Sequence, residues 1–116
     1  MGTVTIWHNK GCGSSKNALA YLQDKGIEPL VYEYLKERPG KAELEALLAR
    51  AGLKPSELLR PKEKRGEELG LYADDVAEDT ILQAMAENAK LIQRPVVITD
   101  KGAVIARPKT RIDEIL

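Results

Sequence analysis

The sequence predicts an α/β fold. A mixed β-sheet is expected from a β-α-β unit near the N-terminus and a β-hairpin near the C-terminus, with a helical insertion between them. Residues 3–8 alternate around apolar side chains, residues 14–25 carry apolar side chains at helical spacing, and two β-branched runs flank the turn at 100–102. The right-handed crossover of a β-α-β unit makes its strands parallel, so the antiparallel hairpin completes a mixed sheet.

The N-terminal elements follow from short local patterns. Alternating apolar residues predict the first strand at 3–8. The first helix is expected to start at Ser14 or Ser15, either of which can cap it, and to run to about residue 25, where a glycine follows. Residues 29–34 are rich in β-forming side chains and predict the second strand.

The middle of the chain predicts mainly helices, and the C-terminal part predicts the hairpin. Leucines at helical spacing predict a helix at 41–50, closed by a glycine. The elements expected after it are a short helical turn at 55–59, a charged and partly helical segment at 62–70, a helix from Asp79 or Thr80 to about Asn88, strands at 95–99 and 103–106, and a terminal helix at 110–116. The sequence has no internal repeat and no linker pattern, so we expect one domain over residues 1–116.

Composition narrows the class of protein. Acidic and basic residues number 18 each, so the formal net charge is zero and a general nucleic-acid surface is not expected. No apolar stretch approaches the roughly 20 residues of a membrane span, and the N-terminus has no signal-peptide pattern. A single cysteine can form neither an internal disulfide nor a thiolate metal cluster. We therefore expect a monomeric, cytoplasmic protein with no nucleic-acid or membrane partner.

The only cysteine, Cys12, lies in a glycine-flanked turn between the first strand and the first helix. A thiol at a helix N-terminus faces unpaired backbone N–H groups and the positive end of the helix dipole, and both favour the thiolate. This position favours a reactive thiol over the alternative, a buried structural cysteine. His8, at the strand end, either lowers the pKa of the thiol as a cation or only terminates the strand.

Four of the six prolines follow an arginine, namely Arg38, Arg60, Arg94 and Arg107. The residue before a proline is held extended, so these arginines are expected at element boundaries. If the hairpin turn centres on Lys101, Arg94 and Arg107 lie opposite each other at its open end, where like charges repel. A bound oxyanion would remove this repulsion, because a guanidinium group binds two oxygens at once. Spacing alone more simply predicts solvated surface arginines.

Spacing also excludes several thiol chemistries. Ala18 stands where a Cys-x5-Arg phosphate loop needs its arginine, and Ser15 stands where a Cys-x-x-Cys pair needs its second thiol. A disulfide cycle at Cys12 would therefore need a thiol from outside, from glutathione or another protein. The sequence contains no dinucleotide fingerprint, P-loop or metal-ligand cluster, so we expect no metal and no bound cofactor.

The order of β-α-β unit, hairpin and helix is that of the thioredoxin/glutaredoxin-like fold, here with the helical insertion. Several segments point further, namely Ile6-Trp7-His8-Asn9, Gly11-Cys12-Gly13-Ser14-Ser15 with Asn17, Leu58-Leu59-Arg60, Glu68-Leu69-Gly70-Leu71, Leu91-Ile92-Gln93-Arg94-Pro95-Val96-Val97 and Ala106-Arg107-Pro108. With these segments, most of the chain resembles the glutaredoxin-dependent arsenate reductases of the thioredoxin-like superfamily.

The resemblance implies a set of site residues. Cys12 would be the nucleophile, and His8 would help to activate its thiolate. Arg60, Arg94 and Arg107 would bind arsenate and the arsenite intermediate. We expect these five side chains to form the site.

Four further residues are secondary candidates for this site. They are Asn9, Ser15, Lys16 and Pro95. The resemblance implies that Pro95 is cis and faces the thiol. Lys16 stands where the family often has an arginine, so it keeps the charge but loses the planar fork that binds two oxygens.

The resemblance also implies a reaction and its partners. The Cys12 thiolate would attack arsenate and give a covalent Cys–S–As(V) adduct. Glutathione, as co-substrate, would attack this adduct and reduce it to As(III). A glutaredoxin would then resolve the bound glutathione, with release of arsenite.

Two alternatives remain beside the reductase. An Spx-type transcription regulator would bind RNA polymerase, but such proteins commonly carry a Cys-x-x-Cys switch, which Ser15 breaks here. A glutathione-dependent thiol reductase without arsenate activity would use the same lone thiol. The presence of all three arginines favours the arsenate reductase.

Overall fold

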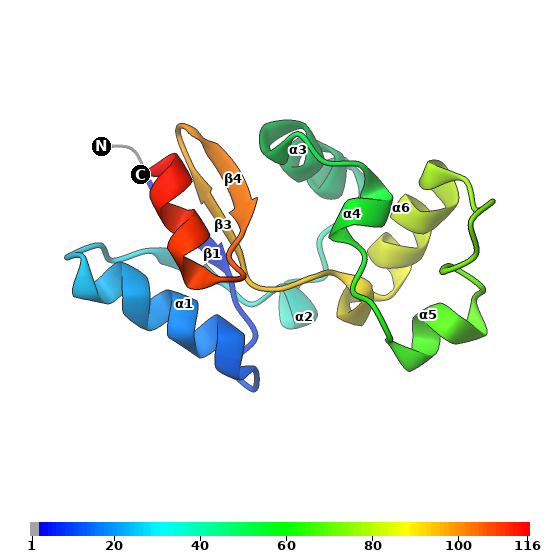
Figure 1. Cartoon of the computed structure of the whole chain (residues 1–116), viewed down its shortest axis with the longest axis horizontal. Helices are drawn as coiled ribbons and strands as arrows, with labels where there is room; N and C mark the ends of the chain where they lie inside the picture. Colours follow the sequence, from blue (N-terminus) through cyan, green and yellow to red (C-terminus); the bar gives the residue numbers. More distant parts are fainter. Residues whose placement is uncertain (1–2) are drawn as a thin grey trace. The chain divides into compact units, whose positions relative to one another are not determined.

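The computed structural model describes residues 3–116, whose elements are drawn in Figure 1. The strands are β1 (Thr5–Trp7), β2 (Leu30–Tyr32), β3 (Val96–Thr99) and β4 (Gly102–Ile105). The α-helices are α1 (Gly13–Asp24), α2 (Tyr34–Glu37), α3 (Lys41–Ala51), α4 (Pro55–Leu58), α5 (Lys64–Glu68) and α6 (Glu78–Glu87). Two 3-10 helices, η1 (Ala89–Leu91) and η2 (Lys109–Ile115), complete the described elements.

The strands form one mixed sheet in the order β2-β1-β3-β4. β1 pairs in parallel with β2 and antiparallel with β3, and β3 pairs antiparallel with β4. In this register Ile6 lies between Val31 and Val97. The predicted α/β class, the parallel first pair and the C-terminal hairpin are confirmed.

The chain divides into two compact units. The first unit contains the chain up to Glu37 together with Arg94–Leu116, and so holds the whole sheet with α1, α2 and η2. The second unit, Arg38–Gln93, holds α3 to η1 and coincides with the expected helical insertion. The expectation of a single domain over residues 1–116 stays a prediction. Within residues 3–116, no helix is long and apolar enough to cross a membrane.

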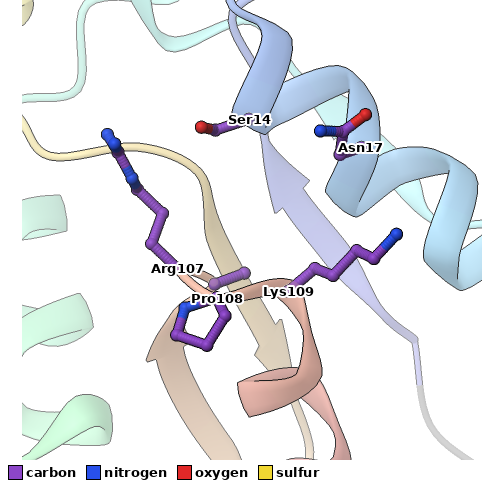
Figure 2. Close-up of a pocket in the computed structure, with 6 residues that line it drawn as sticks. Ser14, Asn17, Arg107, Pro108 and Lys109 are labelled. Atoms are coloured by element: carbon purple, nitrogen blue, oxygen red, sulfur yellow. The ribbon is translucent and has the colours of Figure 1, made fainter.

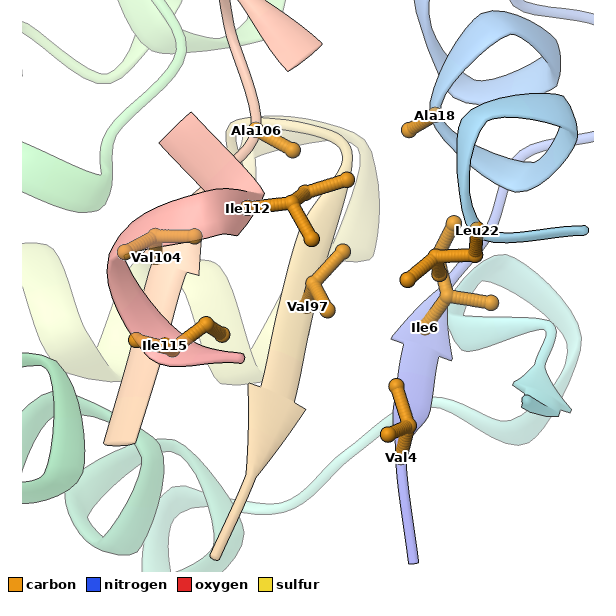
Figure 3. Packing of buried hydrophobic residues seen from close by; sticks show 9 residues of the cluster. All are labelled: Val4, Ile6, Ala18, Leu22, Val97, Val104, Ala106, Ile112 and Ile115. Atoms are coloured by element: carbon orange, nitrogen blue, oxygen red, sulfur yellow. The ribbon is translucent and has the colours of Figure 1, made fainter. Parts of the chain in front are cut away.

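A hydrophobic cluster joins the sheet of the first unit to α1 and η2, as Figure 3 shows. Leu22 from α1 lies beside Ile6 from β1, Ala18 lies one turn earlier on the same helix, and Ile112 from η2 lies near Val97 of β3. The other members of the cluster are Val4, Val104, Ala106 and Ile115. Burial of each large aliphatic side chain contributes about 1.5–3 kcal/mol, so this packing fixes α1 against the sheet.

Helix α1 begins earlier than its two serines suggested. Cys12 is the N-cap, with an extended backbone (φ −106°, ψ 124°), and Gly13 is the first helical residue. Ser14 and Ser15 lie inside the first turn, so the prediction that one of them caps the helix was wrong. The Ser15 hydroxyl instead contacts the segment that follows β1. After the helix, Gly26 adopts a positive φ of 78°, as expected of a glycine that ends a helix.

Other element boundaries also moved. Only residues 30–32 pair as the second strand, because Tyr34 turns inward, is fully buried and starts α2. Helix α6 begins at Glu78, with Ala77 as its N-cap, ahead of the predicted start. The C-terminal segment is a 3-10 helix that starts at Lys109.

The second unit is a small helical assembly. Helix α3 buries the leucine face that its spacing predicted, with Leu44, Leu47 and Leu48 inward, and packs against α6. Gly52 ends α3 in the left-handed conformation (φ 67°), which glycine adopts without a steric cost. A short antiparallel bridge between the residues that follow α4 and η1, Leu59 and Ile92, connects these two parts of the unit.

Candidate active site

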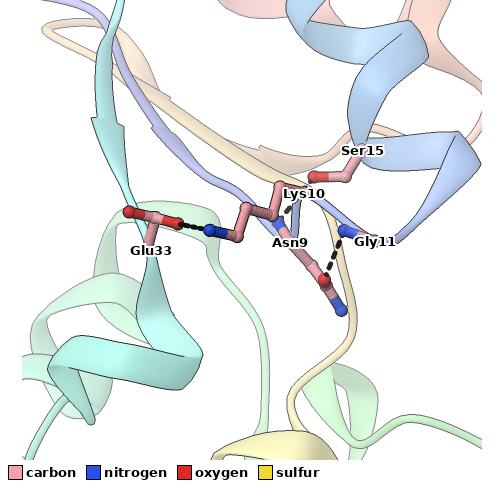
Figure 4. Close-up of polar contacts among 5 residues, drawn as sticks. All are labelled: Asn9, Lys10, Gly11, Ser15 and Glu33. Carbon is pink, nitrogen blue, oxygen red and sulfur yellow. Dashed lines mark hydrogen bonds and ion pairs between the residues drawn. The ribbon is translucent and has the colours of Figure 1, made fainter.

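The site is built on the turn that carries Cys12 from β1 into α1. The Cys12 N–H donates to the Asn9 carbonyl at 2.9 Å, and the Gly11 N–H donates to the Asn9 Oδ1 at 3.0 Å (Figure 4 shows the second bond). The Cys12 carbonyl in turn accepts the Lys16 N–H at 3.0 Å, which starts the helix. These bonds hold the half-buried thiol at the N-terminus of α1.

The electrostatic surroundings of Cys12 favour its thiolate. Burial on its own would raise the pKa of the thiol. A hydrogen bond from the Arg94 side chain, the backbone N–H groups of Ser15 and Ser14, and the charge of Arg94 outweigh burial, so the pKa of Cys12 falls below its ordinary value. Because a thiolate is the nucleophilic form of cysteine, a lowered pKa makes this site more suited to nucleophilic chemistry.

Ser15 connects the residues before and after the thiol. Its Oγ accepts the Asn9 N–H at 2.9 Å and lies 2.8 Å from the His8 Nδ1 (Figure 4 shows the contact with Asn9). Ser15 is fully buried and His8 nearly so. Burial lowers the pKa of His8, and the charge of Lys16 adds to this while Glu33 opposes it, so the neutral imidazole is favoured at pH 7.

Arg94 and Arg107 occupy the open end of the β3–β4 hairpin. The Ala106 N–H donates to the Pro95 carbonyl at 2.9 Å, and continuing this register by one residue places Arg94 opposite Arg107, as predicted. The Arg94–Pro95 peptide bond is cis, as the resemblance implied, and the Arg107–Pro108 bond is also cis. Of the two arginines, Arg94 is the one whose side chain interacts with Cys12.

Arg107 lines a cavity of about 280 Å³ beside the first turns of α1. Figure 2 shows Ser14 and Asn17 projecting from α1, and Arg107 and Lys109 from the segment that follows β4. Two cations, an amide and a hydroxyl therefore line this cavity, and two of these residues, Ser14 and Asn17, follow Cys12 closely in the sequence. This composition suits an anion with several oxygens.

The remaining sequence candidates are distributed as follows. Lys16 is exposed on the first turn of α1. Arg60 belongs to the second unit, where its N–H donates to the Leu91 carbonyl at 2.7 Å and its guanidinium group lies 3.6 Å from the Glu63 carboxylate. The binding role of Arg60 stays a prediction. Within residues 3–116, no three His, Cys, Asp or Glu side chains gather as metal ligands.

The sequence reasoning missed Tyr34. Its buried hydroxyl interacts electrostatically with both Arg94 and Cys12. The local pattern around this tyrosine predicts only the end of a strand, and gives no reason to connect its hydroxyl with Cys12.

The fold and the site together define a class of protein: a thioredoxin-like domain with one activated thiol at a helix N-terminus that interacts with an arginine, and with a cis peptide bond between that arginine and the following proline. Comparison with known proteins narrows this class. The chain belongs to the ArsC family, whose model matches residues 7–115.

Individual relatives agree with this family. The chain is 45% identical over 114 residues to a protein named arsenate reductase from Rhizobium meliloti (strain 1021), covering 98% of this chain and 81% of the relative. It is 38% identical over 116 residues to an arsenate reductase from Escherichia coli (strain K12), covering 100% of this chain and 82% of that protein. Among solved structures, an arsenate reductase from Vibrio cholerae matches with a TM-score of 0.94 and 38% identity, covering 99% and 98% of the two chains.

Proposed function

We propose that this chain reduces arsenate to arsenite, with Cys12 as the nucleophile. The observation that carries the proposal is the half-buried thiol whose pKa is lowered by Arg94 and by the backbone N–H groups at the start of α1. Membership of the ArsC family and the arsenate reductases among its relatives supply the substrate. Such a thiol requires a reducing compartment, so we place the protein in the cytosol.

The first step forms a bond between sulfur and arsenic. Arsenate is a tetrahedral oxyanion, and the guanidinium groups of Arg60, Arg94 and Arg107 are planar forks that match its oxygens. The Cys12 Sγ attacks arsenic, the S–As bond forms, and one As–O bond breaks as that oxygen leaves as water with two protons. The cationic Arg94 side chain, which interacts with Cys12, stabilises the negative charge on the remaining oxygens.

The second step transfers two electrons. The thiolate of glutathione attacks the Cys12 sulfur, an S–S bond forms, and the electron pair of the S–As bond stays on arsenic. As(V) becomes As(III), which stays bound as arsenite, while Cys12 and glutathione are oxidised to a mixed disulfide. A glutaredoxin thiolate then attacks the glutathione sulfur and returns Cys12 as a thiolate, with release of arsenite. The external thiols replace the second cysteine, whose place in the sequence Ser15 occupies.

The test is a coupled assay with arsenate, glutathione, glutaredoxin, glutathione reductase and NADPH. We expect NADPH consumption that depends on arsenate and is abolished in Cys12→Ser. Absence of turnover, or equal turnover by Cys12→Ser, would sink the proposal. Activity on glutathionylated peptides without activity on arsenate would identify a thiol reductase instead, and capture of RNA polymerase without either activity would identify a regulator.

The arginines are tested in the same assay. Arg60→Ala, Arg94→Ala and Arg107→Ala should each raise the half-saturating arsenate concentration about 10- to 100-fold, as expected for loss of a charged hydrogen bond. Arg111→Ala is the matched control, because Arg111 pairs with Glu114 inside η2 at 3.4 Å. An arginine whose removal matches the control does not bind arsenate.

A further inference from the structure

Tyr34 places a phenol hydroxyl inside the first unit, within electrostatic range of the thiol. It is the first residue of α2 and is fully buried. Its ring stacks on Trp7 of β1, with the ring centroids 6.3 Å apart and an interplanar angle of 19°. The packing of the two rings fixes where the hydroxyl points.

The polar neighbours of this hydroxyl are hydrogen-bond donors. The Arg94 guanidinium group has only N–H groups to offer. The Asn9 side chain also faces Tyr34, and its Oδ1 already accepts the Gly11 N–H at 3.0 Å, so the amide N–H₂ is the group left for the phenol oxygen. Among residues 3–116, the Tyr34 hydroxyl makes no hydrogen bond of good geometry, and no neighbour accepts its proton.

A buried O–H group without an acceptor is costly in a folded protein, and sites that keep one usually use it. An anion suits this hydroxyl as an acceptor, because the surroundings already supply donors and a positive charge. The thiolate of Cys12 is close enough for its charge to act on Tyr34. Burial, the largest influence, raises the pKa of Tyr34, so the phenol keeps its proton at neutral pH and remains a donor.

We propose that the Tyr34 hydroxyl stabilises the anion at Cys12: its dipole acts on the thiolate in the free protein, and it donates a hydrogen bond to an oxygen of arsenate in the complex. The second half of this statement rests on the proposed function. The proton stays on tyrosine, and no bond is broken. Tyr34 is thus a catalytic residue that complements Arg94, a neutral donor next to a cationic one.

The test is Tyr34→Phe, which removes the hydroxyl and keeps the ring. We expect kcat/KM for arsenate to fall about 10- to 100-fold, the loss typical of one hydrogen bond to a charged group. We also expect the midpoint of urea unfolding to stay or rise, because the hydroxyl has no acceptor among residues 3–116. Tyr21→Phe is the control: Tyr21 donates to Asp113 on the surface, at 2.9 Å, and its loss should leave kcat/KM unchanged.

A second readout does not depend on arsenate. The pKa of Cys12 can be followed by the ultraviolet absorbance of its thiolate, and Tyr34→Phe should raise this pKa because the thiolate loses the dipole of the hydroxyl. If the thiol pKa is raised in Tyr34→Phe but the wild-type protein is inactive on arsenate, the role of Tyr34 is supported and the proposed function is contradicted. An unchanged thiol pKa together with unchanged kcat/KM, or a lowered unfolding midpoint, would overturn the role of Tyr34.

Discussion

At the scale of single residues, the thiol is held by a short chain of polar contacts. The buried Ser15 hydroxyl joins the Asn9 N–H at 2.9 Å to the His8 Nδ1 at 2.8 Å. Asn9 in turn holds the Gly11 N–H, so the turn around Cys12 is connected to the first turn of α1. Ser15 therefore stabilises the turn that carries Cys12, in addition to standing where a Cys-x-x-Cys pair would have its second cysteine.

Ser15→Ala should destabilise the protein, because it leaves the Asn9 N–H and the His8 ring nitrogen without their partner. A loss of about 1–3 kcal/mol in the free energy of unfolding is expected from urea titration. Ser14→Ala is the matched control, since the Ser14 side chain is only half-buried and faces the cavity in Figure 2, and it should cost less than about 0.5 kcal/mol. Equal losses in the two variants would contradict the structural role of Ser15.

His8 gives the fold a pH dependence. Its pKa is lowered on folding, chiefly by burial, so between the folded value and the unfolded value of 6.5 the unfolded chain binds more protons. The stability is therefore fully present above pH 6.5 and is lost as the pH falls through the folded pKa. His8 is the only histidine, so a single imidazole resonance in an NMR titration reports it. A midpoint at or above 6.5 would contradict this prediction.

At the scale of elements, the sequence predicts those helices, strands and turns that are determined by the hydrophobic period and by the turn residues. The strands, the hairpin with its glycine and the leucine face of α3 all appear near their expected positions. Boundaries failed where a tertiary contact decides them. The Ser15 hydroxyl contacts His8 and Asn9 and does not cap the helix. The burial of Tyr34 ends the second strand early. Neither contact is visible in a local pattern.

Helix α5 depends on a glycine for packing. A Cβ at Gly66 would lie 2.5 Å from the Tyr72 hydroxyl oxygen, which is itself held by the Glu63 N–H at 3.0 Å and donates to the Arg60 carbonyl. Gly66→Ala should therefore cost about 1–3 kcal/mol in the free energy of unfolding, measured by denaturant titration. In a Tyr72→Ala background most of this cost should disappear, as a double-mutant cycle would show. An unchanged cost in that background would place the strain elsewhere.

At the scale of the whole molecule, the first unit is assembled from both ends of the chain. β1 and α1 carry the thiol, while the flanks of β3 and β4 supply Arg94 and Arg107 from the C-terminal part of the sequence. The sequence predicted the hairpin register that sets the two arginines opposite each other. It could not predict which side chain reaches the sulfur, because that depends on how α1 packs on the sheet.

The C-terminal η2 closes this assembly, so its packing should control the stability of the whole first unit. Ile112 is fully buried among residues of β1, α1 and β3, and the neighbouring Asp113 lies 3.3 Å from the Lys25 ammonium group at the end of α1. Ile112→Ala should cost about 2–5 kcal/mol in the free energy of unfolding, because it removes buried methyl groups and leaves a cavity. Val31→Ala on the exposed edge strand should cost less than about 1 kcal/mol.

The same packing should also control activity. Because η2 holds α1 in place, Ile112→Ala should lose its arsenate reductase activity at a lower temperature than the wild-type protein, and this temperature should fall together with the unfolding midpoint. Comparable costs for the two variants would show that η2 is dispensable for the unit that carries the thiol.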